Sequence, residues 1–248
     1  MKKGLLVIMT GVMLFASLTI VNAESQSDTI TNRSGVVIPI EKYNALKSIY
    51  SNNFMEFMTQ DQYDIIKDKD LSKVEIMETT DEDLNASGIS PQAQEYTTTS
   101  KSLRIVNNNG YITMTLTWLK VPSIKKYDVM AFRLNSSVTR TSGYAFRQYY
   151  VYNNVLDAST ATYPLDFDNG SGVTFKVHSG TDHQMELSFN VTGTGRVYGS
   201  YQHACNSSAT LANAMDYIIS GSGYGGVILF NERIESKFDG MGGVYLTI

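Results

Sequence analysis

The run at residues 111–119 (YITMTLTWL) limits what this chain can fold into more than any other feature. Apolar side chains stand at every second position from Ile112 to Trp118, with threonines between them. Because side chains on a β-strand point alternately to its two faces, this pattern predicts a strand that buries one face. We expect Trp118 in the core and the threonines on a solvent-exposed face.

Similar runs recur towards the C-terminus, separated by clusters of Gly, Asn, Asp and Ser. Residues 107–110 (NNNG) predict a hairpin turn that joins residues 111–119 to a strand at 101–106. Further strands are predicted at 127–134, 144–152, 172–178, 185–191, 195–205, 209–219, 227–230, 233–238 and 244–248, although the Ala, Leu and Met of 209–219 would also suit a helix. No segment has helical spacing long enough for a crossover between parallel strands. The pattern predicts a mainly β chain, with an antiparallel β-sandwich or jelly-roll-like domain.

The N-terminus has the features of an export signal. Lys2 and Lys3 precede an apolar run at residues 5–21, and small residues stand at Val21 and Ala23. This order of charge, apolar run and small residues predicts cleavage after Ala23 and secretion. An uncleaved anchor is the alternative. No later stretch is apolar enough to span a bilayer, so we expect no transmembrane span after cleavage.

The segment between the signal and the strands is acidic and has short helical patterns. Residues 24–95 hold 14 acidic and 6 basic side chains, whereas residues 96–248 hold 10 and 12. Pro39 and Glu41 suit the first turn of a helix, and Thr59 with Gln62 has the form of a capping box. The expected order is a signal peptide at 1–23, a flexible N-terminus at 24–37, a small helical hairpin at 38–70, an acidic linker at 71–95 and a β-sandwich domain at 96–248.

Composition and motifs exclude several functional classes. Neither half is basic enough to predict nucleic acid as a partner. Cys205 is the single cysteine, so no internal disulfide can form. The glycine-rich stretch 221–226 leads into a strand rather than a helix, so it lacks the helix terminus that holds phosphate. No nucleophile elbow or zinc-binding helix is present. We predict no catalytic residue, and the sequence favours a non-enzymatic protein.

Cys205 lies two residues after His203 and raises the question of a thiol–imidazole pair. Side chains at i and i+2 of a strand run parallel, so they do not point at each other as catalysis requires. Alternation places both on the more apolar face, beside Tyr201, and predicts a structural role in a central strand. If this strand binds a ligand, the opposite face carries the candidates, which are Arg196, Tyr198, Ser200 and Gln202.

Two stretches resemble metal sites without completing one. His178 and His183 flank a predicted hairpin with Asp182, but no third well-placed zinc ligand is evident. Residues 166–172 (DFDNGSG) offer Asp166 and Asp168 as oxygen ligands for calcium, although no Glu closes the loop. The same residues suit an ordinary turn. We therefore expect no cofactor and keep calcium at Asp166 and Asp168 as the weaker alternative.

Tyrosine is the strongest compositional bias of the β half, which holds 13 of the 16. Tyrosine rings pack flat against apolar surfaces and offer a hydroxyl, so a face lined with them suits ligand binding. Tyrosine is also a common strand residue. The predicted binding residues are Tyr149, Tyr150, Tyr152, Tyr163, Tyr198 and Gln202.

One resemblance covers most of the mature chain. The signal peptide, the helical segment with MTQDQYDII (residues 58–66) and the β domain with VYGSYQHA (residues 197–204) resemble uncharacterised secreted proteins of low-GC Gram-positive bacteria. The resemblance implies export from a bacterial cell. It implies no activity, cofactor or site residue.

These observations lead to one functional hypothesis with two alternatives. The first is a secreted, non-enzymatic β-sandwich that binds an extracellular or cell-surface glycan or protein. The second is a secreted hydrolase whose residues come from distant strands. The third is a pore-forming protein, because the run 97–102 and the face of Thr113, Thr115 and Thr117 resemble amphipathic barrel strands.

Overall fold

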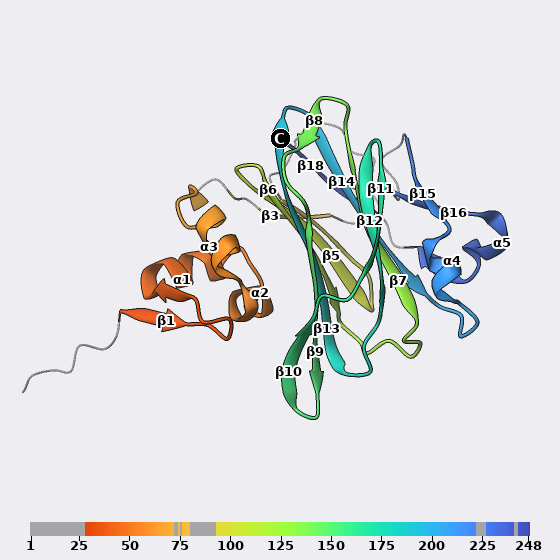
Figure 1. Cartoon of the computed structure of the whole chain (residues 1–248), viewed down its shortest axis with the longest axis horizontal. Helices are drawn as coiled ribbons and strands as arrows, with labels where there is room; N and C mark the ends of the chain where they lie inside the picture. The colour runs from red at the N-terminus through yellow and green to blue at the C-terminus, as the bar shows by residue number, and fades with distance from the viewer. Residues whose placement is uncertain (1–27, 72–73, 75, 80–92, 222–226, 241–242) are drawn as a thin grey trace, which may run out of the picture.

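The computed structural model describes residues 28–71, 74, 76–79, 93–221, 227–240 and 243–248. The predicted signal peptide with its cleavage site, and residues 222–226 of the glycine-rich stretch, lie outside them. Two β-sheets pack face to face, and smaller units cover their two outer faces (Figure 1). The prediction of a mainly antiparallel β-sandwich preceded by a short helical segment is confirmed.

The first sheet has eight strands in the order β10-β9-β13-β6-β5-β4-β3, with β8 also paired to β13. All its described pairs are antiparallel except β3 with β4, which is parallel. Its strands are β3 (Ile76–Thr79), β4 (Ala93–Thr97), β5 (Lys101–Asn108), β6 (Tyr111–Trp118), β8 (Val138–Arg140), β9 (Ala145–Tyr152), β10 (Val155–Ser159) and β13 (Thr181–Gly193).

The second sheet has six strands in the order β11-β12-β7-β14-β17, with β18 also paired to β14. All its pairs are antiparallel. Its strands are β7 (Tyr127–Leu134), β11 (Tyr163–Phe167), β12 (Gly170–Lys176), β14 (Arg196–Ala204), β17 (Phe238–Gly240) and β18 (Val244–Thr247). Of these, β11 was not predicted from the sequence, and neither were β3, β4, β8 and β10 of the first sheet. Residues 71–95 were expected to be a linker, but β3 and most of β4 lie there.

The main core lies between the two sheets. Ile112, Met114 and Leu116 of β6 are fully buried in it, as the alternation predicts, and Trp118 packs against its margin. The turn before β6 is the predicted hairpin. Asn109 and Gly110 both adopt positive φ, 50° and 84°, as a tight turn between twisted strands requires.

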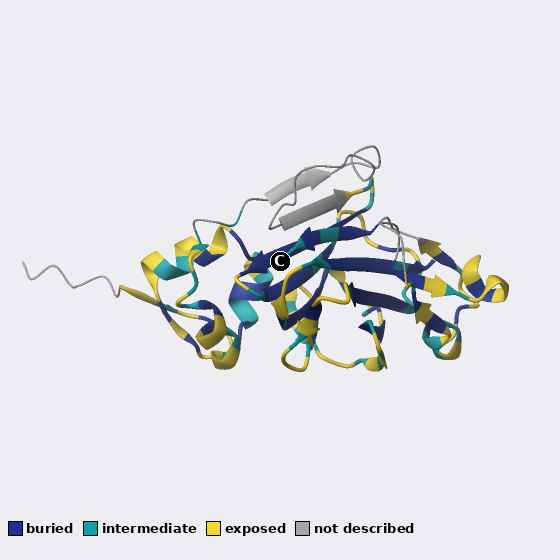
Figure 2. Cartoon of the chain, turned by 90° about the horizontal axis from the view of Figure 1, so that it is seen from above, coloured by how far each residue is buried: buried dark blue, intermediate teal, exposed yellow. Residues whose placement is uncertain are grey.

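A helical unit, residues 28–71, covers the outer face of the first sheet (Figures 1 and 2). It holds β1 (Thr29–Thr31), β2 (Val37–Pro39), α1 (Ile40–Lys47), α2 (Asn52–Phe57) and α3 (Gln60–Ile66). The predicted capping box of Thr59 and Gln62 is confirmed at the start of α3. Residues 24–37 were expected to be flexible, but β1 and β2 form a two-stranded sheet there. No described helix is long and apolar enough to cross a membrane.

A C-terminal cap covers the outer face of the second sheet. It consists of α4 (Leu211–Met215), β15 (Tyr217–Ile219), β16 (Ile228–Phe230) and α5 (Glu232–Glu235). The strands predicted at 209–219 and 233–238 are therefore wrong over α4 and α5. Local capping explains both corrections: Thr210 and Asn213 form a capping box, and Asn231 accepts a hydrogen bond from the Arg233 amide.

The threonine face of β6 does not meet solvent as the sequence predicted. Thr113 is 2% exposed, and Thr115 and Thr117 are half-buried. They line a cavity of 110 Å³ beneath the helical unit, together with Tyr50. The polar face that suggested a membrane-barrel strand is therefore an internal surface of this fold.

Candidate functional site

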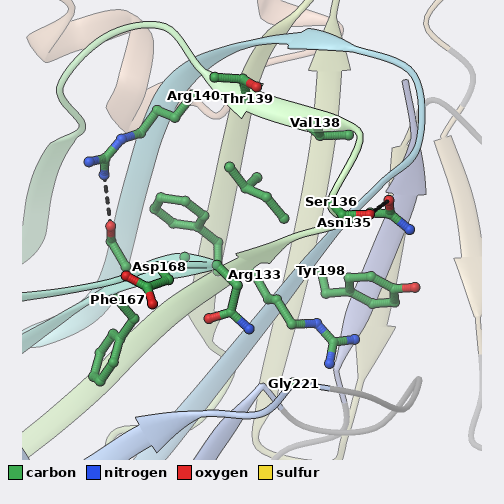
Figure 3. A pocket seen from close by; sticks show the side chains of 15 residues that line it. Arg133, Asn135, Ser136, Val138, Thr139, Arg140, Phe167, Asp168, Tyr198 and Gly221 are labelled. Atoms are coloured by element: carbon green, nitrogen blue, oxygen red, sulfur yellow. Dashed lines mark hydrogen bonds between the residues drawn. The ribbon is translucent and has the colours of Figure 1, made fainter.

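A cleft of 840 Å³ is lined by residues of the second sheet and of β8 (Figure 3). Its walls come from the end of β7, the whole of β8, the turn between β11 and β12, and Gly221, which follows β15. The cleft therefore joins elements that are far apart in the sequence. A volume of this size accommodates a small ligand or a short segment of a polymer.

The floor of the cleft is a stacked pair, Arg133 of β7 and Tyr198 of β14. These residues are direct neighbours across the two strands, and the guanidinium carbon lies 4.2 Å from the centre of the tyrosine ring. Arg133 also donates to the carbonyl of Ser220 at 2.9 Å. Arg133 is 5% exposed. The cation–π contact and this hydrogen bond hold its guanidinium in place before any ligand binds.

Arg140 of β8 lies at the side of the cleft. It donates a hydrogen bond to the Ser171 hydroxyl at 2.8 Å and forms an ion pair with Asp166 at 3.4 Å. The Ser171 hydroxyl in turn donates to the Asp166 carboxylate at 2.5 Å. Asp168 lies at the exposed rim of the same cleft. Asp166 and Asp168 thus offset the charges of the two arginines, so the cleft carries polar groups without an excess of charge.

The candidate calcium loop at residues 166–172 forms a hairpin. Strand β11 ends at Phe167, β12 begins at Gly170, and only Asp168 and Asn169 lie between the strands. A Cβ at Gly170 would lie 2.1 Å from the Phe132 carbonyl oxygen, so the backbone of β7 leaves room for glycine alone. No group of three or more Asp, Glu, His or Cys that could hold a metal occurs among the described residues.

The predicted tyrosines do not gather into one surface. Tyr149 is 1% exposed and packs against Phe57 of the helical unit, and Tyr150 stacks on His178 with ring centres 3.6 Å apart. Tyr152 and Tyr163 are exposed, but they belong to different sheets. Gln202 is half-buried and does not line the cleft. Of the six predicted residues, Tyr198 alone lines it.

His203 is part of a buried polar network at the margin of the core. The carboxylate of Asp128 accepts hydrogen bonds from the Tyr201 hydroxyl, from His203 Nδ1 at 3.0 Å and from the Ala204 amide at 2.9 Å. Trp118 donates to the Tyr201 oxygen at 3.2 Å, which joins the first sheet to the second. These donors satisfy the buried carboxylate in place of water. Because the Trp118–Tyr201 hydrogen bond connects this network to the first sheet, the network also ties the two sheets together.

Cys205 does not share this environment. It was expected on the apolar face beside His203, but β14 ends at Ala204 and Cys205 is exposed. Its sulfur lies 3.9 Å from the Ser236 carbonyl oxygen, and the partner of His203 is Asp128 rather than the thiol. The expectation of a buried cysteine is therefore wrong, because the strand ends one residue earlier than the alternation suggests.

The other two histidines also have structural surroundings. His183 Nε2 lies 2.9 Å from the Gly180 carbonyl oxygen, and burial lowers the pKa of its imidazole. Burial also lowers the pKa of His178, which is stacked on Tyr150. Asp182, considered with these two histidines as a zinc ligand, accepts a hydrogen bond from the Thr181 hydroxyl.

Sequence reasoning missed Arg133 and Arg140, the main polar groups of the cleft. One signal was available for Arg133, because it is the single charged residue inside the apolar stretch VMAFRL of β7. Charged residues are rarely buried without partners, so such a position suggests a specific role. The position of Arg140 on the short strand β8 had no comparable signal.

Comparison with known proteins gives little similarity. No protein-family model and no curated protein matches the chain. Among solved structures, the chain is similar to the crystal structure of ACE19, the collagen-binding subdomain of the Enterococcus faecalis surface protein ACE. The match covers 39% of this chain and 77% of that chain, with 10% identity and a TM-score of 0.30. Collagen binding is a property of that subdomain, and the fold of this chain rests on its own strand pairing and core.

Proposed function

We propose that the protein is exported, with cleavage after Ala23, and that its β-sandwich binds an extracellular glycan without chemically changing it. The observation that carries this proposal is the cleft with Arg133, Arg140, Asp168 and Tyr198. Concave sites with a few well-placed polar groups are the usual ligand sites of proteins.

The chemistry of the cleft favours a glycan over an acidic or basic protein segment. Its polar groups are planar guanidinium, carboxylate and amide groups, which can bond two neighbouring hydroxyls at once. The half-buried ring of Phe167 adds an apolar surface of the kind on which sugar rings pack. Because the charges offset one another, a strongly charged partner gains little here, whereas neutral hydroxyl groups find both donors and acceptors.

A glycan array with the mature chain tests this proposal. Asp168→Ala removes a hydrogen-bond acceptor at the rim of the cleft. The affinity for the glycan that the array retains is expected to fall roughly tenfold, as for the loss of a charge-assisted hydrogen bond. Asp68→Ala is the matched control, because Asp68 is also exposed but lies in the helical unit. Retention of no glycan, or equal binding by the Asp168 variant, would contradict the proposal. Capture of a protein partner alone would also contradict it, and release of shortened glycan would favour a hydrolase.

A further inference from the structure

A second cavity, of 550 Å³, lies between the helical unit and the outer face of the first sheet. Its lining comes from α3 and the preceding Thr59, from β6, β9 and β13, and from loop residues 142–144, 160 and 162, none of which lines the cleft. Tyr111 of β6 and Ile65 of α3 give this lining apolar surface, whereas the rings of Tyr144 and Phe146 pack on Phe132 and Phe175 in the core. The cavity is therefore a separate site from the one proposed above.

Glu186 is the most unusual group in this cavity. It lies in the middle of β13 between Met185 and Leu187, which point into the core, so its side chain points to the outer face. The residue is 3% exposed, and its Oε2 atom has no hydrogen-bond partner among the described residues. A buried polar atom without a partner is costly, which marks this oxygen as a place where a ligand can supply a missing donor.

Burial raises the pKa of Glu186 to about 8, although the nearby Arg147 acts in the opposite direction. The guanidinium of Arg147 is already engaged, because it donates to the Phe57 carbonyl at the C-terminal end of α2. Helix C-termini carry partial negative charge, so part of the arginine charge is balanced there. The charged or titratable groups that face Glu186 are Tyr111 of β6, Arg147 and Tyr149 of β9, Asp61 of α3 and Tyr50 after α1.

We propose that this cavity binds a small organic cation, with an ammonium group on an aromatic or apolar body, whose N–H donates to Glu186 Oε2. The ionised carboxylate of Glu186 and the exposed Asp61 both favour positive charge, whereas the arginine is held by α2. The Tyr111 ring and the Ile65 side chain favour the body of such a ligand, and the tyrosine ring attracts its cationic end. An anion of the same size would meet the Asp61 carboxylate, and the guanidinium of Arg147 in the lining already donates to the Phe57 carbonyl.

The proposed binding includes a proton transfer that can be measured. Below pH 8 the free protein holds a proton on Glu186, and the bound ammonium requires the carboxylate. The proton therefore leaves the carboxyl oxygen for the solvent as the cation binds. Affinity for the cation is expected to rise with pH up to about 8 and to level off above it, because no proton then has to leave.

Three probes with one aromatic ring and different head groups test the charge preference of the cavity. They are phenethylammonium, the neutral 2-phenylethanol and the anionic phenylacetate, each titrated calorimetrically into the mature chain. Phenethylammonium is expected to bind more tightly than either of the others by roughly tenfold or more, as expected for one charged contact in a buried site. Equal binding of the three probes, or saturable binding of none, overturns the proposal.

Glu186→Gln tests the role of the carboxylate and is expected to lower the affinity for phenethylammonium at least tenfold. Glu41→Gln is the matched control, because Glu41 is exposed on α1. Unchanged binding by the Glu186 variant overturns the proposal. A second measurement needs no variant: titration at pH 6.5 in two buffers of different ionisation enthalpy must show release of a proton. Identical heats in the two buffers also overturn it.

Discussion

The two units that cover the sandwich are attached by different kinds of interaction. The C-terminal cap joins the second sheet through one apolar and aromatic cluster, to which β7 contributes Val129 and Ala131. The helical unit also shares an apolar cluster with Val106 and Tyr111 of the first sheet, but it adds side-chain hydrogen bonds across the contact. The apolar attachment contributes a continuous core, whereas the polar attachment leaves room for ligands.

The polar contacts of the helical unit mostly end on backbone carbonyls. Arg104 donates to the Ile49 carbonyl at 2.8 Å, and Lys69 of the unit donates to the Asn109 carbonyl at 2.6 Å. The excess acidic charge of the N-terminal half therefore plays little part in these contacts. Two cavities, of 110 and 550 Å³, lie between the unit and the sheet. Groups such as Glu186 remain without partners in such an interface, which is why the second ligand site is expected there.

The largest expected effect is the loss of a ring from the C-terminal cap. Tyr217 is 5% exposed and packs against Phe167 and Phe230, with ring centres 5.7 and 6.0 Å away. Its hydroxyl comes so close to β12 that a Cβ at Gly172 would lie 2.2 Å from it. Tyr217→Ala is expected to lower the free energy of unfolding of the sandwich by about 4 kcal/mol in a urea titration.

Phe54→Ala in the helical unit is the comparison for that variant. Phe54 is fully buried and stacks on Tyr50 at 4.6 Å, but its cluster lies outside the sandwich core. We expect faster hydrogen exchange of the amides in residues 40–66. The free energy of unfolding of the sandwich is expected to fall by less than in Tyr217→Ala. Equal losses of global stability in the two variants would show that both units fold as one with the sheets.

The sequence predicts the sandwich well because its strands alternate. The predicted strand 127–134 coincides with β7, and the apolar face of β6 lies in the core. Two short helices were missed, because the caps at Thr210 and Asn231 act over a few residues while apolar content suggests a strand. Such local hydrogen bonds can outweigh propensity.

The sites are less predictable, because they depend on distant segments. Glu186 in the run MELSF alternates with apolar residues and therefore looks like a solvent-facing position. It is buried by the helical unit, which comes from more than a hundred residues earlier in the chain. Tyr198 was found from its strand, but the approach of Arg140 to the same cleft depends on the placement of β8.

The second expected effect is a pH dependence confined to the interface with the helical unit. The pKa of Glu186 is raised from 4.5 to about 8, so the folded chain holds a proton that the unfolded chain loses. The contribution of this group to stability is fully present below pH 4.5 and falls as pH rises towards 8. By pH 7 the expected loss is on the order of 3 kcal/mol.

Urea titrations at a series of pH values, with wild type and Glu186→Gln side by side, measure this contribution. The variant cannot ionise at this position, so the difference between the two proteins removes the effect of all other titrating groups. The variant is expected to gain stability relative to wild type as pH rises from 4.5 to 8. A constant difference over this range would show that Glu186 is not buried as a protonated acid.

The smallest expected effect is at the boundary where β14 ends and the chain turns towards the C-terminal cap. Cys205 is exposed, and its amide donates to the Lys237 carbonyl at 2.9 Å, a bond that any side chain at this position keeps. Cys205→Ser is expected to change the free energy of unfolding by less than about 0.5 kcal/mol. Ala204→Ser, one residue earlier, places a hydroxyl in the buried apolar cluster and is expected to cost about 1–3 kcal/mol. A larger loss for Cys205→Ser than for Ala204→Ser would mean that the apolar attachment of the cap extends past the end of the strand. We expect Ala204→Ser to lose more unfolding free energy than Cys205→Ser. Ala204 is then the last residue of β14 whose side chain contributes to the attachment of the cap.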